Sequence, residues 1–563
     1  DFTLEVDGFI SDPATVGKVY IDTKKINMAE LPLNAVWQEA EISSGILEMK
    51  LWADWKNSHF ESALISLNID NFLMSLMEKP QTNLNKLSSY LVWQRQSDGW
   101  IFESQQTDIV SQNRIWPDAS LSIRMRKIDQ QKKYNITASR LELGIWADLF
   151  LATPNLDAEV RHQLLTMDPN GFLDDARITG IIENDTLTDI RINAHFSELT
   201  WQPWKGIPGV SSIAGQFEVH KDRGVLILDS RDSSIDYASL FRWPFIVKSL
   251  NSKISWTLSD ELISVELNHL NIDLTDAQLL ADGRFDIHRD SDVVDMNLYA
   301  ELSNGNVAKT KYFLPSGIMG EKLVNYLDQS IKSGSLPSAQ ISLRGPASYF
   351  PFSNAEGVFA INAQVTDTQF VFTDGWPEVN NINADLWFVE NSMDIRVLEA
   401  NSNGQKISKA SAIIENFSAE PALLLIKSSS NGDAEDGMDY IFNSPLKSSI
   451  GKIFDIIPAK GAFDLDLDLL IPLSGDVNVR VDGLVHLKGN SILVKPIDMP
   501  ITNIQGEINI SDSLVNAKKL SVELMEGKSL YSLKQKRDAK GSVLTTIQGK
   551  GQISAAGLRT VFP

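Results

Sequence analysis

The sequence contains no cysteine and no long apolar run. Without cysteine, disulfides and thiolate chemistry are excluded. No stretch approaches the roughly 18 consecutive apolar residues that a membrane-spanning helix needs. The first ten residues, DFTLEVDGFI, also lack the basic and apolar regions of a signal peptide. We therefore expect an internal piece of a longer protein, in which any membrane anchor lies outside these 563 residues.

Basic residues are outnumbered, because 51 Lys and Arg face 73 Asp and Glu, giving a formal net charge of −22. Affinity for nucleic acid comes largely from Lys and Arg on phosphates, so this balance argues against a nucleic-acid partner. It also argues against adsorption along an anionic membrane surface.

Catalytic and cofactor signatures are missing as well. The seven histidines (59, 162, 195, 220, 269, 288 and 486) are never closer than 19 residues, which rules out short metal-binding spacings such as HExxH. Gly527, Lys528 and Ser529 resemble the end of a phosphate loop, but Val522 stands where its first glycine is needed. We predict no enzymatic activity, no metal and no cofactor.

What the chain does contain is strict alternation of apolar and polar residues, as in AFDLDLDLLIP at 462–472. Successive side chains of a strand point to opposite faces, so one face here is apolar and the other carries Asp464, Asp466 and Asp468. These aspartates resemble the start of a calcium loop, but Leu469 and Gly475 replace its glycine and glutamate. The same alternation recurs at 359–366, 393–399, 477–483 and 504–510, with turns predicted at NSNG (401–404) and SNGN (303–306).

Helical periodicity is scarce and recurs in one context, a proline, an amphipathic stretch and a glycine followed by a strand. We predict short helices at 32–45, 154–171, 315–334 and 445–461, the second capped by Thr153 and the fourth by Ser444. The stretch 428–437, SSSNGDAEDG, is predicted to be a solvated loop. The inward stripes would be Leu33, Val36, Trp37 and Ala40; Leu156, Val160 and Leu164; Met319, Leu323, Leu327 and Ile331; and Ile450, Ile453, Phe454 and Ile457.

A second repeated pattern is an apolar residue, two polar residues, Ile (Leu in one copy), any residue, a small residue, any residue and an apolar residue. It occurs as VSSIAGQF (210–217), VKSLNSKI (247–254), VNNINADL (379–386) and ITNIQGEI (501–508), each preceded by an X-Pro pair. Interleaved with the helical units, these copies indicate a repeated supersecondary module of one short helix and several antiparallel strands.

Tryptophan is concentrated early, with eleven of thirteen before residue 257. Because tryptophan stacks on sugars, carbohydrate binding is an alternative. However, Trp201, Trp204, Trp243 and Trp376 stand beside the proline turns, where they are expected to close the ends of strand pairs.

Residues 312–352, 374–397 and 444–473, with their helix, glycine and strand units, resemble the YhdP-type branch of the AsmA-like family. The resemblance implies an envelope protein of Gram-negative bacteria, anchored in the inner membrane by an N-terminal helix. It further implies a long β-groove with an apolar interior that moves phospholipid towards the outer membrane, as a bridge-like lipid transport protein. The chain lacks the anchoring helix and would be a middle, periplasmic segment.

These observations predict a mostly β protein, an elongated, twisted antiparallel β-sheet groove built from repeated modules, each with a short helix. We expect one continuous segment, with approximate modules at 1–30, 31–153, 154–314, 315–444 and 445–563. The predicted function is a phospholipid conduit across the periplasm, with phospholipids and the inner and outer membranes as partners. A non-conducting envelope scaffold and, less favoured, an extracellular carbohydrate-binding protein are the alternatives. The predicted groove lining is Ile341, Leu343, Phe359, Ile361, Val365, Phe370, Phe372, Leu386, Phe388, Ile395, Val397, Phe463, Leu465, Leu467, Leu469, Val477, Val479, Val481, Ile508 and Ile510.

Overall fold

The computed structural model describes residues 2–7, 15–31, 40–56, 59–76, 82–111, 114–151, 156–291, 293–372, 374–444, 459–474, 479–494, 499–511, 514–538 and 543–561. They form two compact units. The first consists of residues 1–275 and 284–292, and the second of residues 276–283 and 293–563.

The first unit consists of strands with two helices. Its elements are β1 (Phe2–Asp7), β2 (Val16–Asn27), η1 (Met28–Glu30), β3 (Ala40–Lys56), β4 (His59–Leu76), β5 (Thr82–Gln96), β6 (Gly99–Ser111), β7 (Arg114–Ile128), β8 (Gln131–Glu142), α1 (Leu143–Leu151), α2 (Ala158–Met167), β9 (Asn170–Glu183), β10 (Thr186–Trp201), β11 (Gly209–His220), β12 (Arg223–Asp236), β13 (Phe245–Leu258) and β14 (Leu262–Leu274). Strand β15 (Gln278–His288) contributes residues to both units.

The second unit has the same character. Its elements are β16 (Val294–Asn306), η3 (Val307–Tyr312), α3 (Glu321–Ser330), β17 (Ile331–Pro346), η4 (Ala347–Tyr349), β18 (Val358–Phe370), β19 (Val379–Val389), β20 (Ser392–Ser402), β21 (Gln405–Ile414), β22 (Leu423–Asp433), α4 (Ala434–Phe442), β23 (Ala459–Lys460), β24 (Ala462–Pro472), β25 (Arg480–Val494), β26 (Met499–Ser511), β27 (Leu514–Leu524), β28 (Gly527–Arg537), β29 (Val543–Gly551) and α6 (Ala555–Val561).

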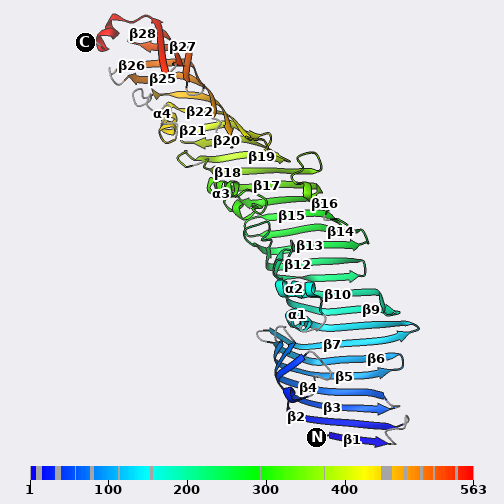
Figure 1. The fold of residues 1–563 in the computed structure, drawn as a ribbon. Helices are drawn as coiled ribbons and strands as arrows, with labels where there is room; N and C mark the ends of the chain where they lie inside the picture. Colours follow the sequence, from blue (N-terminus) through cyan, green and yellow to red (C-terminus); the bar gives the residue numbers. More distant parts are fainter. Residues whose placement is uncertain are drawn as a thin grey trace. The chain divides into compact units, whose positions relative to one another are not determined.

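Strands make up 72% of the chain, which confirms the predicted mostly β class with few, short helices. Within each unit the long strands pair antiparallel with their neighbours in chain order, as Figure 1 shows. The exception is the short β23, which pairs with β25, while β22 and β24 pair directly. Neighbouring strands in such a sheet lie about 4.8 Å apart, so each added strand lengthens the unit in one direction.

β-Bulges recur in many strands and explain the second repeated sequence pattern. The third residue of three copies of the pattern, Ser212, Asn381 and Asn503, has a positive φ of 56°, 53° and 51°. The strand register shifts at each of these points. A bulge bends its strand and increases the local twist. The pattern therefore marks the place where a strand bends.

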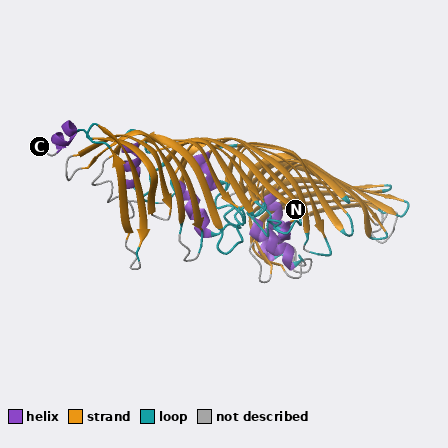
Figure 2. Ribbon diagram, turned by 90° about the horizontal axis from the view of Figure 1, so that it is seen from above, coloured by secondary structure: helices purple, strands orange, loops and turns teal. Residues whose placement is uncertain are grey.

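The bulges allow the strands to curve around an inner face. Figure 2 shows the helices lying on the inner side of the curved strands, except for the short helix at the C-terminus. The residue after the bulge in the pattern is often well buried: Ile213 and Ile504 are 5% exposed and Leu250 is 3% exposed. The buried core of each unit therefore consists of small clusters near the bends rather than one thick layer.

Tight hairpins connect many strands, and one of the two predicted turns proves to be part of a strand. Asn403 and Gly404 both have positive φ, as a type I′ turn requires, which confirms the turn predicted at 401–404. The other predicted turn, at 303–306, was wrong. Those residues end strand β16 and stay paired with β17 without a register shift, although Asn304 has a positive φ of 54°.

The predicted helices are confirmed in part. The segments 154–171 and 315–334 contain α2 and α3, but both are shorter than predicted. The cap of α2 is Asp157, which accepts hydrogen bonds from the backbone N–H groups of Glu159 and Val160. In the segment 32–45, residues 40–45 are strand, and the rest lies outside the described residues, as does 445–458.

The predicted inward stripes hold only in part: Leu156, Leu164, Met319, Leu327 and Ile331 are half-buried, but one residue of each stripe is exposed. Helix α2 has no buried residue, and Val160 is 42% exposed. In α3 Leu323 is 47% exposed, and Val324 is buried in its place. Both helices touch the sheet along less of their surface than an amphipathic pattern suggests.

Three α-helices of the described residues were missed, namely α1, α4 and the C-terminal α6. The stretch 428–437, predicted to be a loop, forms the end of β22 and the start of α4, because Asp433 caps α4 by accepting a hydrogen bond from the backbone N–H of Glu435. Helix α1 directly follows β8, and its Ile145 is fully buried against Ile109, Trp116 and Ala119.

Candidate functional site: an apolar groove

In the second unit the strand register aligns apolar side chains into rows that cross the sheet. Residues paired across neighbouring strands lie on the same face. One row includes three predicted groove residues and runs through Ile341, Ile361, Phe388, Met393, Ile414, Leu424 and Ile471. A parallel row runs through Ala363, Leu386, Ile395, Ala412, Ile426, Leu469 and Val481.

Further predicted residues extend these rows on the same face. Leu465 pairs with Val485, which pairs with Ile508, and Leu343 pairs with Phe359. Leu467 lies opposite Gly483, which pairs with Ile510. The register therefore places on one face of the sheet predicted residues that are more than 150 positions apart in the sequence.

Most of these side chains are half-buried. Of the twenty predicted groove residues, all but Phe372, Val477 and Val479 are half-buried. Phe372 follows the end of β18 and is 39% exposed, whereas Val479 precedes β25 and is 51% exposed. Val477 lies outside the described residues. A face of partly exposed large apolar side chains differs from a core, because no second layer covers it.

The first unit has an equivalent row that sequence reasoning did not assign. It runs across β2 to β14 through Val19, Ala53, Ala63, Trp93, Phe102, Ile123, Ile136, Ile178, Ile192, Val219, Gly224, Trp256 and Val265. All of these are apolar or glycine, and most are half-buried. The signal that could have found them is the alternation in each strand.

The opposite face is polar and carries ion pairs. Two aspartates of β24 are paired with neighbouring strands: the Lys488 Nζ of β25 lies 2.5 Å from Asp464, and the Ser429 hydroxyl of β22 donates a hydrogen bond to Asp466 over 2.6 Å. Arg396 pairs with Asp394 at 2.8 Å. These charged and polar groups bind one another or water, so this face needs no covering layer.

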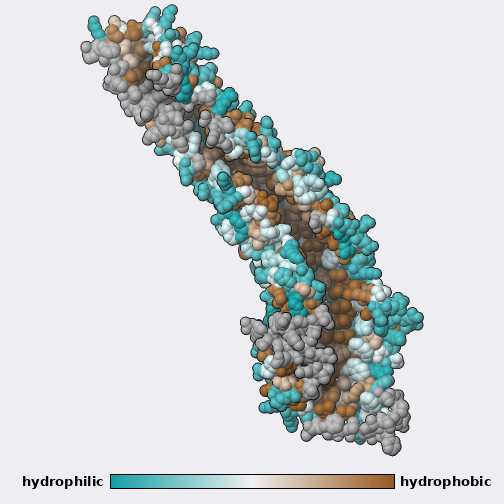
Figure 3. All heavy atoms as spheres, viewed as in Figure 1, coloured by the Kyte–Doolittle hydropathy of each residue, from teal (hydrophilic) through white to brown (hydrophobic). Residues whose placement is uncertain are grey.

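The apolar face is hollowed. Figure 3 shows, in each unit, a strip of hydrophobic residues sunk between hydrophilic rims. Within each unit the strip runs across the strands, which is the direction in which the apolar rows described above run. Each unit therefore contains an open groove with an apolar floor.

Three helices lie on this apolar face. Helix α1 packs through Ile145 on Ile109 and Trp116. Ile109 pairs with Leu87 of β5, and Leu87 lies on the same face of β5 as Trp93, a residue of the apolar row. The Tyr326 ring of α3 lies 6.3 Å from that of Phe370, and α4 contacts Phe463 at Gly437. Each helix covers the groove at one end of the strands.

Comparison with known proteins identifies the family. A family model described as "YhdP protein" matches residues 1–563. The chain belongs to the YhdP family. "Intermembrane phospholipid transporter YhdP" from Escherichia coli (strain K12) is 24% identical over 474 residues, covering 82% of this chain. The chain spans 37% of the length of that relative. The family predicted from the helix, glycine and strand units is confirmed.

A charged cluster anchors α1 on the groove of this YhdP-family chain. The Glu142 carboxylate accepts hydrogen bonds from the backbone N–H groups of Ile145 (2.6 Å) and Gly144 (3.3 Å) at the start of the helix. Arg114 pairs with Asp148 of α1 at 2.9 Å and with Asp168 at 3.0 Å. Burial raises the pKa of Glu142, although its backbone hydrogen bonds oppose the shift. Burial likewise raises the pKa of Asp148, and Arg114 opposes it.

The tryptophans beside the proline turns serve the fold. The Trp201 indole donates a hydrogen bond to the Pro208 carbonyl over 2.9 Å, and the backbone of Trp204 pairs with Ile207 in the same turn. Trp376 packs against Tyr440 of α4. These contacts match the predicted closing of strand ends.

Within the described part of the chain, no three His, Asp or Glu side chains converge as a metal site. None of the helices described there is long and apolar enough to cross a membrane.

Proposed function

We propose that this chain forms part of a conduit that carries phospholipid acyl chains in its apolar groove. The observation that carries the proposal is the set of continuous rows of half-buried apolar side chains in both units, opposite a polar face. Apolar surface on this scale marks a binding surface in soluble proteins. An acyl chain fits an open groove because it needs contact along its length but no hydrogen bonds.

The energetics suit movement of lipid along the groove. Burying one methylene group contributes roughly 0.8 kcal/mol, so an acyl chain is held while its head group stays in water. Rows of similar aliphatic side chains offer many sites of nearly equal energy. A lipid can then slide from one strand to the next without meeting a deep trap.

The partners in this proposal are phospholipids and the inner and outer membranes, and the location is the periplasm. Support comes from the E. coli relative, whose name describes an intermembrane phospholipid transporter. We further propose that the chain acts as one continuous segment and carries out no catalytic step. The helices α1, α3 and α4 would narrow the groove where they lie.

A non-conducting scaffold is the main alternative, and bound lipid separates the two. The chain should be purified from bacterial membranes in mild detergent, and its bound lipids extracted and identified by mass spectrometry. A conduit predicts co-purifying phospholipid in at least molar proportion. Its absence from protein that is folded by circular dichroism would contradict the proposal and favour the scaffold.

A further inference from the structure

The hairpin formed by β7 and β8 is basic in a strongly acidic chain. Residues 124–133, RMRKIDQQKK, contain five cationic side chains and one acidic side chain, Asp129. The net charge of the whole chain is −22. The fold alone does not explain why cationic side chains are concentrated on this hairpin.

The register divides these cations between the two faces of the sheet. Lys127 lies directly opposite Lys132, and Ile123 lies opposite Ile136, with no register shift between the two pairs. Lys132 in turn pairs with Ile182 on β9. Both lysines therefore lie on the apolar face of the groove, at the tip of the hairpin. The other three cations, Arg124, Arg126 and Lys133, lie on the polar face.

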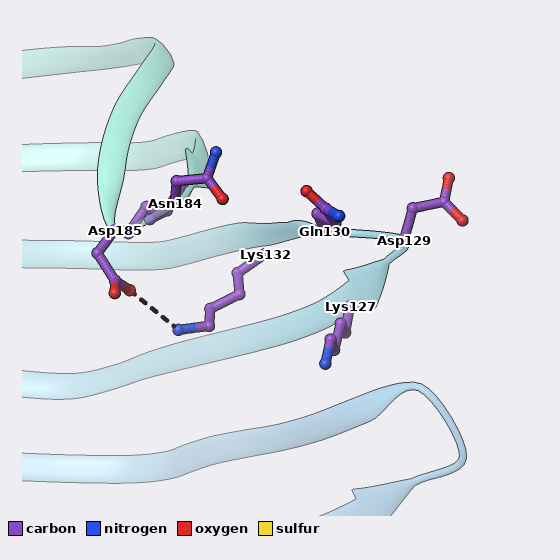
Figure 4. Close-up of a pocket in the computed structure, with 7 residues that line it drawn as sticks. Lys127, Asp129, Gln130, Lys132, Asn184 and Asp185 are labelled. Atoms are coloured by element: carbon purple, nitrogen blue, oxygen red, sulfur yellow. Dashed lines mark hydrogen bonds and ion pairs between the residues drawn. The ribbon is translucent and has the colours of Figure 1, made fainter.

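The two lysines are poorly neutralised. Like charges directly opposite each other on neighbouring strands destabilise the pair. Lys132 has one ion-pair partner, Asp185 at 3.4 Å, whose side chain is 91% exposed. Within the described part of the chain Lys127 makes no ion pair, whereas Arg126 on the polar face pairs with Asp98 at 2.6 Å. Figure 4 shows the Asp129 carboxylate pointing away from both lysines.

The lysines border a depression at the edge of the groove. It has a volume of about 290 Å³ and is lined by Lys127, Lys132, Asp185, Ile182 and the turn residues Asp129, Gln130 and Asn184. It contains both cationic groups and an apolar side chain, and it is open to water.

An apolar column starts at this depression. Along β7 the groove face carries Lys127, then Met125, Ile123 and Leu121, and each of these pairs with a residue of β8. At about 3.4 Å per residue the column extends roughly 20 Å from the lysines. Two positive charges at the wet end of an apolar column match an amphiphile with an anionic head and a long tail.

We propose that Lys127 and Lys132 bind the phosphate group of a glycerophospholipid whose acyl chains lie along Met125, Ile123 and Leu121. This inference rests on the proposed lipid-binding function. Lysine ammonium groups make charge-assisted hydrogen bonds to phosphate oxygens. The site would hold the head group at the rim while the tails enter the groove.

The test compares two double variants of the full chain. K127Q/K132Q removes the groove-face charges, and R124Q/K133Q removes the same charge from the polar face of the same hairpin. Binding of short-chain phosphatidylglycerol, of the matching diacylglycerol, which has no phosphate, and of inorganic phosphate should be measured by calorimetry at low salt. Circular dichroism checks folding.

K127Q/K132Q should weaken phosphatidylglycerol binding about five- to ten-fold, the loss expected for two partly exposed charge contacts. Diacylglycerol binding should not change in either variant, and R124Q/K133Q should bind both lipids as the unmodified chain does. The loss should shrink at high salt, because the contacts are exposed.

The other outcomes separate the claims. If both lipids bind and neither double variant changes their affinity, the phosphate site is wrong while lipid binding stands. An equal loss in both double variants would also overturn the site, because the effect would then follow net charge. If inorganic phosphate binds at these lysines and phosphatidylglycerol does not displace it, the head-group assignment is wrong. If neither lipid binds the unmodified chain, the proposed function itself fails.

Discussion

A glutamate at position 412 should block lipid movement through the groove of the second unit. Ala412 lies on the apolar face between Ile395 and Ile426 of the neighbouring strands. A carboxylate there would stay hydrated, since the groove is open, so the sheet should fold normally. A passing acyl chain would lose its apolar contact at this point.

The size of the barrier follows from the spacing of the sheet. Strands lie about 4.8 Å apart, so one side chain contacts roughly three to four methylene groups of a chain crossing the strands. At about 0.8 kcal/mol per methylene, leaving these groups beside a hydrated charge costs about 3 kcal/mol. A barrier of that size slows passage about a hundred-fold, and one slow point limits the whole conduit.

Two control variants make this test specific. Ser411 is the adjacent residue on the polar face, and its neighbours are Arg396 and Lys427. Ser411→Glu adds the same side chain beside two cations and should leave transport unchanged. Ala412→Leu adds bulk without charge and should slow transport far less than Ala412→Glu.

The assay is the rate of phospholipid delivery to the outer membrane in cells where each variant is the sole copy of the full-length protein. Protein level and protease resistance should be followed in parallel. Native transport by a folded Ala412→Glu variant would refute the groove as the path. Equal loss from Ser411→Glu would show that charge on either face disturbs assembly rather than passage.

Three further predictions concern the fold and its chemistry. Asn381→Gly should leave the free energy of unfolding nearly unchanged. Asn381→Val should lower it by about 1–2 kcal/mol, because a β-branched residue resists the positive φ of this bulge. Equal stability of the two variants in urea titrations would contradict the role of the bulge. Burial raises the pKa of Glu142 above its ordinary 4.5, so the folded state favours the protonated carboxyl group. The resulting contribution to stability is present below pH 4.5 and is lost as the pH rises through the higher pKa of the folded state. Glu142→Gln should therefore gain melting temperature relative to the unmodified chain between pH 4 and pH 8, and a pH-independent difference would contradict this. Replacing each of the seven histidines by alanine should leave lipid delivery intact, and loss in any folded variant would reopen a metal or catalytic role.

The faces of the strands could be predicted from the sequence because antiparallel pairing preserves them. Leu386 and Ile395 were assigned to one face by alternation alone, and the register places them directly opposite each other. Alternation fails at a bulge, where one extra residue inverts the pattern. Strands β6 and β9 contain such residues at Gln106 and Asp175, and the register shifts there.

Helices were less predictable, because their periodicity does not show whether a face finds a partner. Val160 belongs to the predicted apolar stripe of α2, yet its side chain is 42% exposed, and no residue of α2 is buried. The start of α4 is so polar that its sequence favours a loop, and what forms the helix is the cap at Asp433 together with apolar residues further along, including Tyr440. The lysine pair at the rim was not predicted either, because the net charge of the whole chain does not reveal a basic hairpin within it.

The central claim is that lipid tails contact one face of the sheet, and site-specific photo-crosslinking in living cells tests it most directly. A photoreactive residue should replace Leu467 or Ile136 on the apolar face, and Asp466 or Asn135, their neighbours on the polar face. Phospholipid adducts, identified by mass spectrometry, are expected at Leu467 and Ile136 and none at Asp466 and Asn135. Equal adducts from both faces, or none from the apolar face in folded protein, would contradict it.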